Sequence, residues 1–221
     1  MNVYHVLNRG VDKRNIFLDD QDRARFVHDL YEFNDTHPTN NNYTRTIPMR
    51  DIVSPSLSNT REKIVDIHGW VLMDNHYHLL LSERVEGGLS LFIRKLNVGY
   101  AKYFNERYDR SGTLFQGRTK KILIEHDAHF LYILHYVHLN PLDRHEETAA
   151  WRSQRIPDIP QTLSQLADYR WSSYLDYAGV KNFPSILTTT LFNESLGGAT
   201  RALTRYLEAM DHTHIQALTL E

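Results

Sequence analysis

Apolar and polar positions alternate over residues 3–10, a stretch rich in β-forming side chains, which predicts a strand. Residues 19–34 begin with aspartates and then carry apolar side chains at helical spacing. This arrangement predicts an amphipathic helix with a polar N-cap. Residues 37–63 are rich in Asn, Thr, Ser and Pro and have little periodicity, so they predict a long loop or insertion.

The middle of the chain predicts a hairpin followed by a helix. Residues 64–73 and 76–83 are strand-like, and Asp74-Asn75 between them is typical of a two-residue turn. Residues 87–108 place five apolar or aromatic side chains on one helical face, which predicts a second amphipathic helix.

A short strand at residues 120–125 and a helix at residues 127–140 complete the pattern. Asp127 is the expected N-cap of this helix, and Pro141 stands just past its end. The order β-α-β-β-α-β followed by a further helix predicts an α+β, ferredoxin-like fold with an antiparallel sheet and both main helices on one face. We therefore expect one domain over residues 1–141 and a helical C-terminal extension over 142–221.

Composition narrows the class of protein. The chain has 221 residues, 41% of them hydrophobic and none of them cysteine, so it can form one ordinary core without disulfides. No apolar run reaches the roughly 18 residues that span a bilayer, and a soluble cytoplasmic protein is expected. The net charge is −2, yet residues 84–121 hold nine basic and three acidic residues. This local excess is compatible with phosphate binding and also with an ordinary surface helix.

The return strand of the hairpin carries His76 and His78. Because side chains alternate along a strand, both imidazoles lie on one face, and Tyr77, Leu79 and Leu81 lie on the other. Two imidazoles so placed can share a divalent metal ion. Two solvent-exposed histidines on an open sheet would show the same pattern.

A third ligand would have to come from another element. His129, Tyr132, Tyr136 and Asn140 are spaced by three, four and four residues, so they lie on one stripe of the helix at 127–140. The same stripe is also compatible with tyrosines at the edge of a core and an asparagine that ends the helix.

Five stretches taken together identify a family. YHVLNRG, GWVLMDNHYHLLL, LNVGYAKYFN, SGTLFQGR and YVHLNP resemble, in order and spacing, the single-tyrosine HUH transposases, most closely the REP-associated tyrosine transposases of bacteria. WSSY at residues 171–174 is similar as well, and the resemblance covers most of residues 3–142. HYH corresponds to the family's His-hydrophobic-His motif, and YVHLN to the motif of its catalytic helix.

The resemblance implies a particular reaction. His76, His78 and Asn140 would bind Mg²⁺ or Mn²⁺, and Tyr136 would attack a phosphate of single-stranded DNA. A 5′-phosphotyrosine and a free 3′-OH would result, and rejoining would need no ATP. Tyr132 is the alternative nucleophile, and Tyr136 is preferred because its spacing to Asn140 matches the motif.

The resemblance also implies the partner, single-stranded or hairpin DNA formed by palindromic repeats, with no membrane association. The protein would act as a monomer or homodimer in the bacterial cytoplasm, near the nucleoid. Basic residues near the predicted turns and helices are the expected phosphate contacts: Arg9, Lys13, Arg14, Arg94, Lys95, Lys102, Arg118, Lys120 and Lys121. A packing or supporting role is expected for His5, a structural one for His68, and none for His135 and His138.

Two other functions fit parts of the pattern. A zinc metallohydrolase could use the His76/His78 pair, but such sites draw further His or carboxylate ligands, and the sequence shows no such cluster. A domesticated relative could bind DNA hairpins without cutting them.

Overall fold

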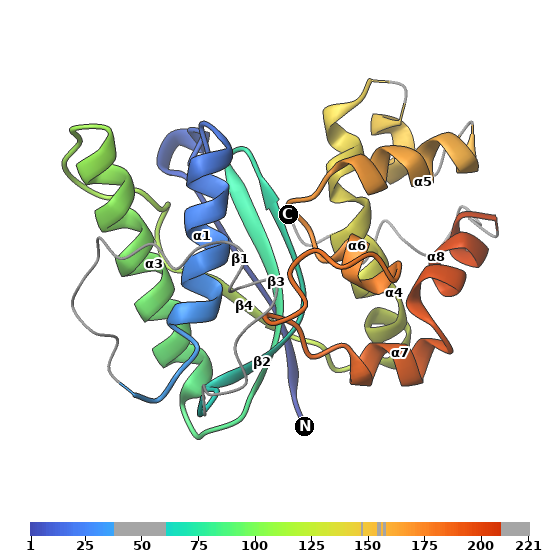
Figure 1. The fold of residues 1–221 in the computed structure, drawn as a ribbon, viewed down its shortest axis with the longest axis horizontal. Helices are drawn as coiled ribbons and strands as arrows, with labels where there is room; N and C mark the ends of the chain where they lie inside the picture. Colours follow the sequence, from blue (N-terminus) through green and yellow to red (C-terminus); the bar gives the residue numbers. More distant parts are fainter. Residues whose placement is uncertain (38–60, 147, 154–155, 157, 209–221) are drawn as a thin grey trace.

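The computed structural model describes residues 1–37, 61–146, 148–153, 156 and 158–208 (Figure 1). The expected polar loop therefore lies outside the described residues from 38 to 60. One sheet contains four strands in the order β2-β3-β1-β4, and every neighbouring pair is antiparallel. The strands are β1 (Val3–Arg9), β2 (Val65–Met73), β3 (His76–Glu83) and β4 (Lys120–Leu123). This order is the ferredoxin-like one, and the predicted α+β class is confirmed.

Helices α1 (Asp20–Glu32) and α3 (Gly88–Arg107) lie side by side on one face of the sheet (Figure 1). The sequence expectation of a capped helix holds for α1, because the Asp19 side chain accepts a hydrogen bond from the Asp22 backbone N–H. The strand residues that alternate towards this face, among them Tyr77 and Leu79, are fully buried in a core with both helices.

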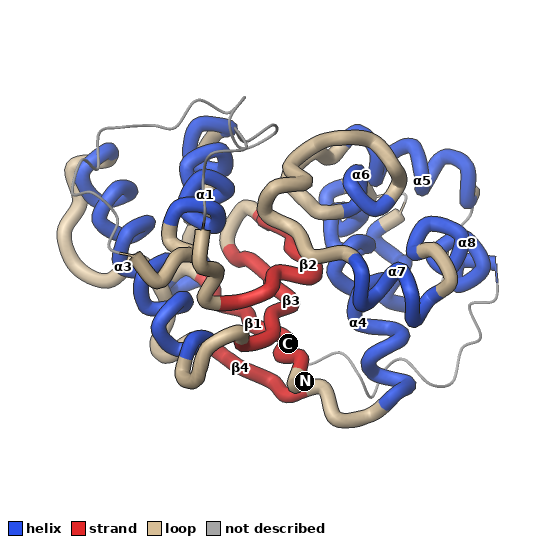
Figure 2. The backbone as a smooth tube through the Cα atoms, turned by 60° about the horizontal axis from the view of Figure 1, so that its bottom comes forward, coloured by secondary structure: helices blue, strands red, loops and turns tan. Residues whose placement is uncertain are grey.

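The opposite face is covered by α4 (Asp127–Leu139) and the helices that follow it (Figure 2). Gly69 of β2 lets α4 approach closely, because a Cβ there would stand 2.9 Å from a methyl group of Leu134. Helix α4 begins one residue earlier than expected: His126 is its N-cap and Asp127 is its first helical residue. An aspartate in the first turn still interacts favourably with the helix dipole.

From Asn140 onward, every regular element among the described residues is a helix. These are η2 (Asn140–Arg144), η3 (Ala149–Ser153), α5 (Ile159–Asp168), α6 (Tyr174–Tyr177), α7 (Thr190–Leu196) and α8 (Ala199–Glu208). Its apolar side chains complete both cores: Trp171 and Phe183 join the α1/α3 side, whereas Trp151 and Phe192 pack with α4. The domain boundary at residue 141 thus remains a prediction, because side chains from both sides of it pack in the same two cores.

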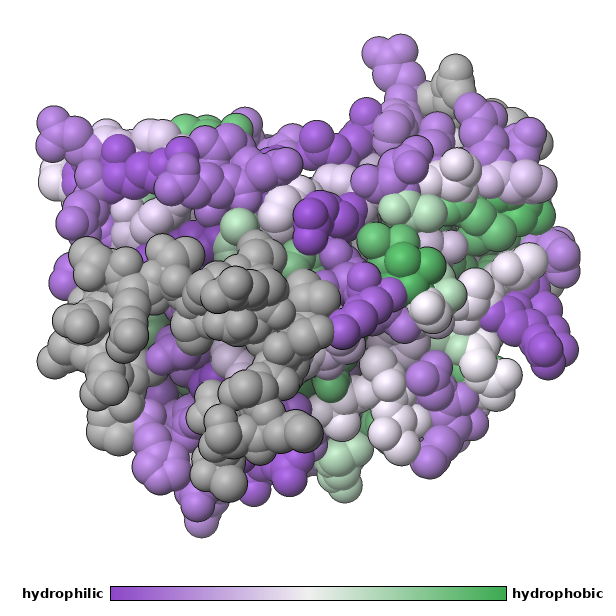
Figure 3. Space-filling view, viewed as in Figure 1, coloured by the Kyte–Doolittle hydropathy of each residue, from purple (hydrophilic) through white to green (hydrophobic). Residues whose placement is uncertain are grey.

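The space-filling view shows polar residues over much of one face, with apolar ones gathered over the C-terminal helices (Figure 3). No helix in the described ranges has both the length and the apolar character needed to span a bilayer.

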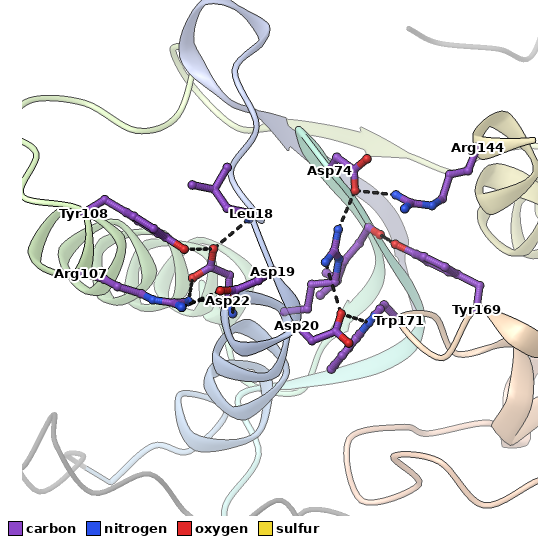
Figure 4. A network of polar contacts seen from close by, with 12 residues as sticks. Leu18, Asp19, Asp20, Asp22, Asp74, Arg107, Tyr108, Arg144, Tyr169 and Trp171 are labelled. Atoms are coloured by element: carbon purple, nitrogen blue, oxygen red, sulfur yellow. Dashed lines mark hydrogen bonds and ion pairs between the residues drawn. The ribbon is translucent and has the colours of Figure 1, made fainter.

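Asp74, in the turn between β2 and β3, joins three parts of the chain (Figure 4). Its carboxylate accepts hydrogen bonds from Arg23 of α1 at 2.6 Å and from Arg144 of η2 at 2.5 Å. Because Asp74 precedes His76 by two residues and Arg144 follows Asn140 by four, this ion pair ties together the two stretches expected to supply metal ligands.

Candidate active site

His76 and His78 lie on the face of the sheet that α4 covers. In the strand register His78 is opposite Leu7 and His76 is opposite Arg9, and the neighbouring same-face residue Leu80 packs with α4. The two imidazole centroids are 4.9 Å apart. The strand therefore presents both rings to the same space beneath α4.

Hydrogen bonds orient both rings. The Nδ1 of His78 is 2.9 Å from Nε2 of His5, and the two rings stack with centroids 5.1 Å apart. His76 Nδ1 is 2.6 Å from the amide oxygen of Asn75, which can only accept, so the proton resides on Nδ1 and the lone pair on Nε2. A carbonyl or ring partner on Nδ1 is the usual way in which a protein prepares Nε2 of a histidine for a metal.

Both His78 and His5 are held neutral. Burial lowers the pKa of His78 well below its usual value, and the nearby His5, His76 and Arg152 lower it further. Burial, with a smaller effect of His129, lowers the pKa of His5 to about 3. Neutral imidazole is the form that binds metal ions, so the environment favours the ligand state at neutral pH.

Tyr136 and Asn140 of α4 and its 3₁₀ continuation meet this pair. The Tyr136 ring is 5.6 Å from that of His78 and 5.8 Å from that of His5, edge-on to both. The Asn140 side-chain amide donates to the Tyr136 backbone carbonyl at 2.7 Å. Asn140 is fully buried and Tyr136 is only 2% exposed, so the helix fixes both side chains against the sheet.

Tyr132, the alternative nucleophile, lies further along the same stripe. Its ring is 6.0 Å from Tyr136 and 5.7 Å from Tyr206 of α8. Burial raises its pKa, and Tyr206 and Tyr136 add to that effect. The ring contacts of His5 and His78 with a tyrosine are made to Tyr136, which supports the choice made from motif spacing.

Arg152 of η3 is the site residue that sequence reasoning missed. One terminal nitrogen, Nη2, donates to Asn140 Oδ1 at 3.0 Å, and the other, Nη1, is 3.4 Å from the Tyr136 hydroxyl. Asp143 pairs with the same guanidinium at 2.8 Å. Burial opposes its charge, but the hydrogen bonds to Asp143 and Tyr136 prevail and raise the pKa of Arg152. Arg152 is one of three arginines in the patternless segment after Asn140, and nothing in the sequence distinguished it from Arg144 and Arg155.

The donor atoms fit a divalent ion. His78 Nε2 is buried and has no hydrogen-bond partner among the described groups, and His76 carries its lone pair on Nε2. Asn140 Oδ1 has two lone pairs, of which Arg152 uses one. Two imidazoles and one amide oxygen, completed by water and a substrate phosphate, suit Mn²⁺ or Mg²⁺. Within the described residues, no three His, Asp or Glu side chains converge as a metal cluster.

Residues 49–140 match the family model described as "Transposase IS200 like". The match covers less than half of the chain, and over this segment the chain is similar to IS200-like transposases. The matched segment includes β2, β3, α3, β4, all of α4 and Asn140, and the predicted resemblance to a transposase family is confirmed. Arg152 and helices α5–α8 lie beyond the IS200-like segment.

A solved structure described as "Structure of the REP associates tyrosine transposase bound to a REP hairpin" is 13% identical to the chain. The similarity covers 85% of this chain and 85% of that one, with a TM-score of 0.49. No curated protein matches the chain.

The basic residues predicted to contact DNA do not gather on one side of the sheet. Arg9 and Lys120 are on the face with the histidines, as their register with His76 and Leu7 shows. Arg94, Lys95 and Lys102 belong to α3, in the helical layer on the other side, and Lys95 donates to the Asp35 backbone carbonyl at 2.8 Å. The remainder lie on loops and edges: Lys13, Arg14 and Arg118 are exposed, and Lys121 donates to Ser90.

The other histidines have structural partners. His68 contacts the Thr188 carbonyl at 3.0 Å and the Ser82 hydroxyl at 2.8 Å. His138 contacts the Ser173 hydroxyl at 2.9 Å, and His135 stacks on Tyr206. These contacts agree with the structural role expected for His68 and give His135 and His138 partners other than His76 and His78.

Buried neutral histidines predict that the protein loses stability below neutral pH. Burial lowers the pKa of His135 to about 4 and, with the effect of His135, that of His138 to about 3. In the unfolded chain both titrate near 6.5, so at acid pH the unfolded state binds more protons than the folded one. The free energy of unfolding therefore falls as pH drops below about 6.5, by roughly 2 kcal/mol per histidine between pH 7 and 5.

Urea unfolding at several pH values measures this effect. His135→Gln is expected to reduce the pH dependence of the free energy of unfolding by the contribution of one histidine. A free energy of unfolding that stays constant from pH 7 to 5 would contradict the neutral burial of these rings.

Proposed function

We propose that this IS200-like transposase nicks single-stranded DNA and transfers the strand through a covalent tyrosine intermediate, with a divalent metal ion. The observation that carries the proposal is the approach of Tyr136 to the histidine pair, 5.6 Å between its ring and that of His78, with Asn140 bonded to the Tyr136 backbone. Nucleophile and ligands thus come from two elements that pack against each other.

In the proposed reaction the Tyr136 oxygen forms a bond to the phosphorus, and the bond from phosphorus to the 3′-oxygen breaks. The tyrosine hydroxyl loses its proton and the departing 3′-oxygen gains one, so charge balances over the step. The 5′-phosphate stays on Tyr136, and attack by a 3′-OH reverses the reaction without ATP. His76, His78 and Asn140 would hold Mg²⁺ or Mn²⁺, which when bound polarises the phosphate.

The DNA substrate we propose is a hairpin of the kind formed by imperfect palindromic repeats, because the five motif stretches most closely resemble those of REP-associated transposases. Arg9 and Lys120 lie on the same sheet face as the histidines, where they can contact phosphates beside the cut. A cytoplasmic location near the nucleoid belongs to the same proposal.

A second candidate is a protein that binds hairpins without cutting them. The burial of Tyr136 and Asn140 favours it, since a phosphate reaches the Tyr136 hydroxyl only when side chains above it move aside. Trp151 of η3, 2% exposed and 5.9 Å from the Tyr136 ring, is one such side chain.

The two candidates are separated by incubating the protein with hairpin oligonucleotides taken from repeats beside its own gene. We expect Mg²⁺ or Mn²⁺ to produce a protein–DNA adduct that survives denaturing electrophoresis, together with a fragment that ends in a free 3′-OH. Chelation of the metal should abolish both products. Tight hairpin binding without cleavage in any divalent metal would instead establish the second candidate.

A further inference from the structure

The Arg152 guanidinium is held in place by the carboxylate of Asp143. The guanidinium contacts the Asp143 carboxylate through Nε at 3.2 Å and Nη2 at 2.8 Å, a two-point contact that fixes the plane of the group. The guanidinium also lies against Trp151, 4.6 Å from the ring centroid. Both anchors belong to the chain beyond the IS200-like segment, as does Arg152 itself.

With the guanidinium anchored in this way, its remaining terminal nitrogen, Nη1, points towards the Tyr136 hydroxyl, the proposed attacking group. Nη1 is 3.4 Å from the Tyr136 hydroxyl, and the guanidinium carbon is 5.3 Å from the Tyr136 ring centroid. Nη2 meanwhile donates to Asn140 at 3.0 Å, so one cation contacts both the attacking oxygen and a ligand amide. A planar, permanently charged donor that is already oriented in a partly buried site costs little reorganisation when negative charge develops near it.

We propose that Arg152 is a catalytic residue that stabilises negative charge on the Tyr136 oxygen and on the phosphate it attacks. This inference rests on the proposed function. As the Tyr136 oxygen bonds to phosphorus and the 3′-oxygen departs, Nη1 donates to the oxygens that gain charge, and Arg152 itself gains or loses no proton. The reverse step, in which a 3′-OH attacks the phosphotyrosine, passes through the same transition state. Arg152 therefore accelerates cleavage and rejoining by the same factor.

A single-turnover assay with a hairpin oligonucleotide and Mn²⁺ tests the role of Arg152. Arg152→Gln is expected to slow cleavage and rejoining each by about 100-fold, the usual effect of removing one oriented donor from a transition state. Hairpin affinity should change by less than about threefold, because one contact at the cut contributes little to binding that is dominated by phosphate contacts elsewhere. Arg201→Gln, at an exposed arginine of α8, should leave both rates unchanged.

Arg152→Ala adds a readout that a purely structural arginine would not give. Free guanidinium ion at millimolar concentration should raise the cleavage rate of Arg152→Ala by at least about tenfold, since a small cation can enter the space that the side chain leaves.

The outcomes separate this inference from the proposed function. If wild-type protein forms no adduct, the proposed function itself fails. If wild type cleaves and Arg152→Gln cleaves as fast, or faster and at lower Mn²⁺ concentration, then Arg152 merely competes with the ion for Asn140 and the inference is overturned. Loss of folding in both variants, without rescue by guanidinium, would also overturn it in favour of a structural role.

Discussion

Tyr136→Phe is expected to abolish the covalent protein–DNA adduct and to reduce strand cleavage by at least about 10⁴-fold. The substitution removes the attacking oxygen, and the general rate of uncatalysed attack by water on a phosphodiester is far lower. The phenyl ring keeps the edge-on contacts with His5 and His78 and the contact with Trp151. The free energy of unfolding and the hairpin affinity should therefore stay close to their wild-type values.

Tyr132→Phe is the matched control for this experiment. Its ring lies on the same stripe of α4 but contacts Tyr136 and Tyr206, so its hydroxyl is expected to be dispensable. Cleavage by Tyr132→Phe should remain within about threefold of wild type by the same single-turnover measurement. An adduct formed equally well by Tyr136→Phe would refute the assignment of the nucleophile.

His78→Ala should have the second-largest effect, a loss of at least about 100-fold in cleavage rate at a fixed Mn²⁺ concentration. The substitution deletes the buried Nε2 that is oriented by His5. Binding of Mn²⁺, followed by the fraction of free ion in solution by electron paramagnetic resonance, should weaken in parallel. Added Mn²⁺ should recover part of the rate, because His76 and Asn140 remain.

His135→Gln is the control for removal of a buried imidazole. His135 is on the same helix as Tyr136, but its ring stacks on Tyr206 of α8. Its cleavage rate and Mn²⁺ affinity should match those of wild type. Unchanged Mn²⁺ affinity in His78→Ala would rule out His78 as a metal ligand.

Local patterns predicted the elements of the fold closely. The strand-like stretches at residues 64–73 and 76–83 and the turn between them correspond to β2 (Val65–Met73) and β3 (His76–Glu83), because both strands are buried between helical layers and need β-forming apolar side chains. The prediction that Asp127 caps α4 was wrong by one residue, since aspartate is favoured both at the cap and in the first helical turn.

The site was only partly predictable. Strand periodicity placed His76 and His78 on one face, and helical periodicity placed Tyr136 and Asn140 on one stripe, but the contact between these two sets depends on which face of the sheet α4 covers. The role of Arg152 depends on how the chain turns back after Asn140 through η2 and η3, and no periodic pattern encodes that return.

The basic residues illustrate the same limit. Residues 84–121 form one basic stretch in the sequence, yet the Lys120 side chain points to the face of the sheet opposite the one that α3 covers. A charge count along the chain contains no information about which side of a sheet each residue occupies. Lys95, which donates to the Asp35 carbonyl, already has an internal partner.

The most direct test of the central claim is to locate the DNA on the protein. A hairpin oligonucleotide is incubated with wild-type protein and Mn²⁺, the adduct is digested with trypsin and nuclease, and the modified peptide is sequenced by mass spectrometry. The account predicts a nucleotide attached through a 5′-phosphate to Tyr136. Attachment to Tyr132 or to any other residue, or cleavage that leaves no attached nucleotide, would contradict it.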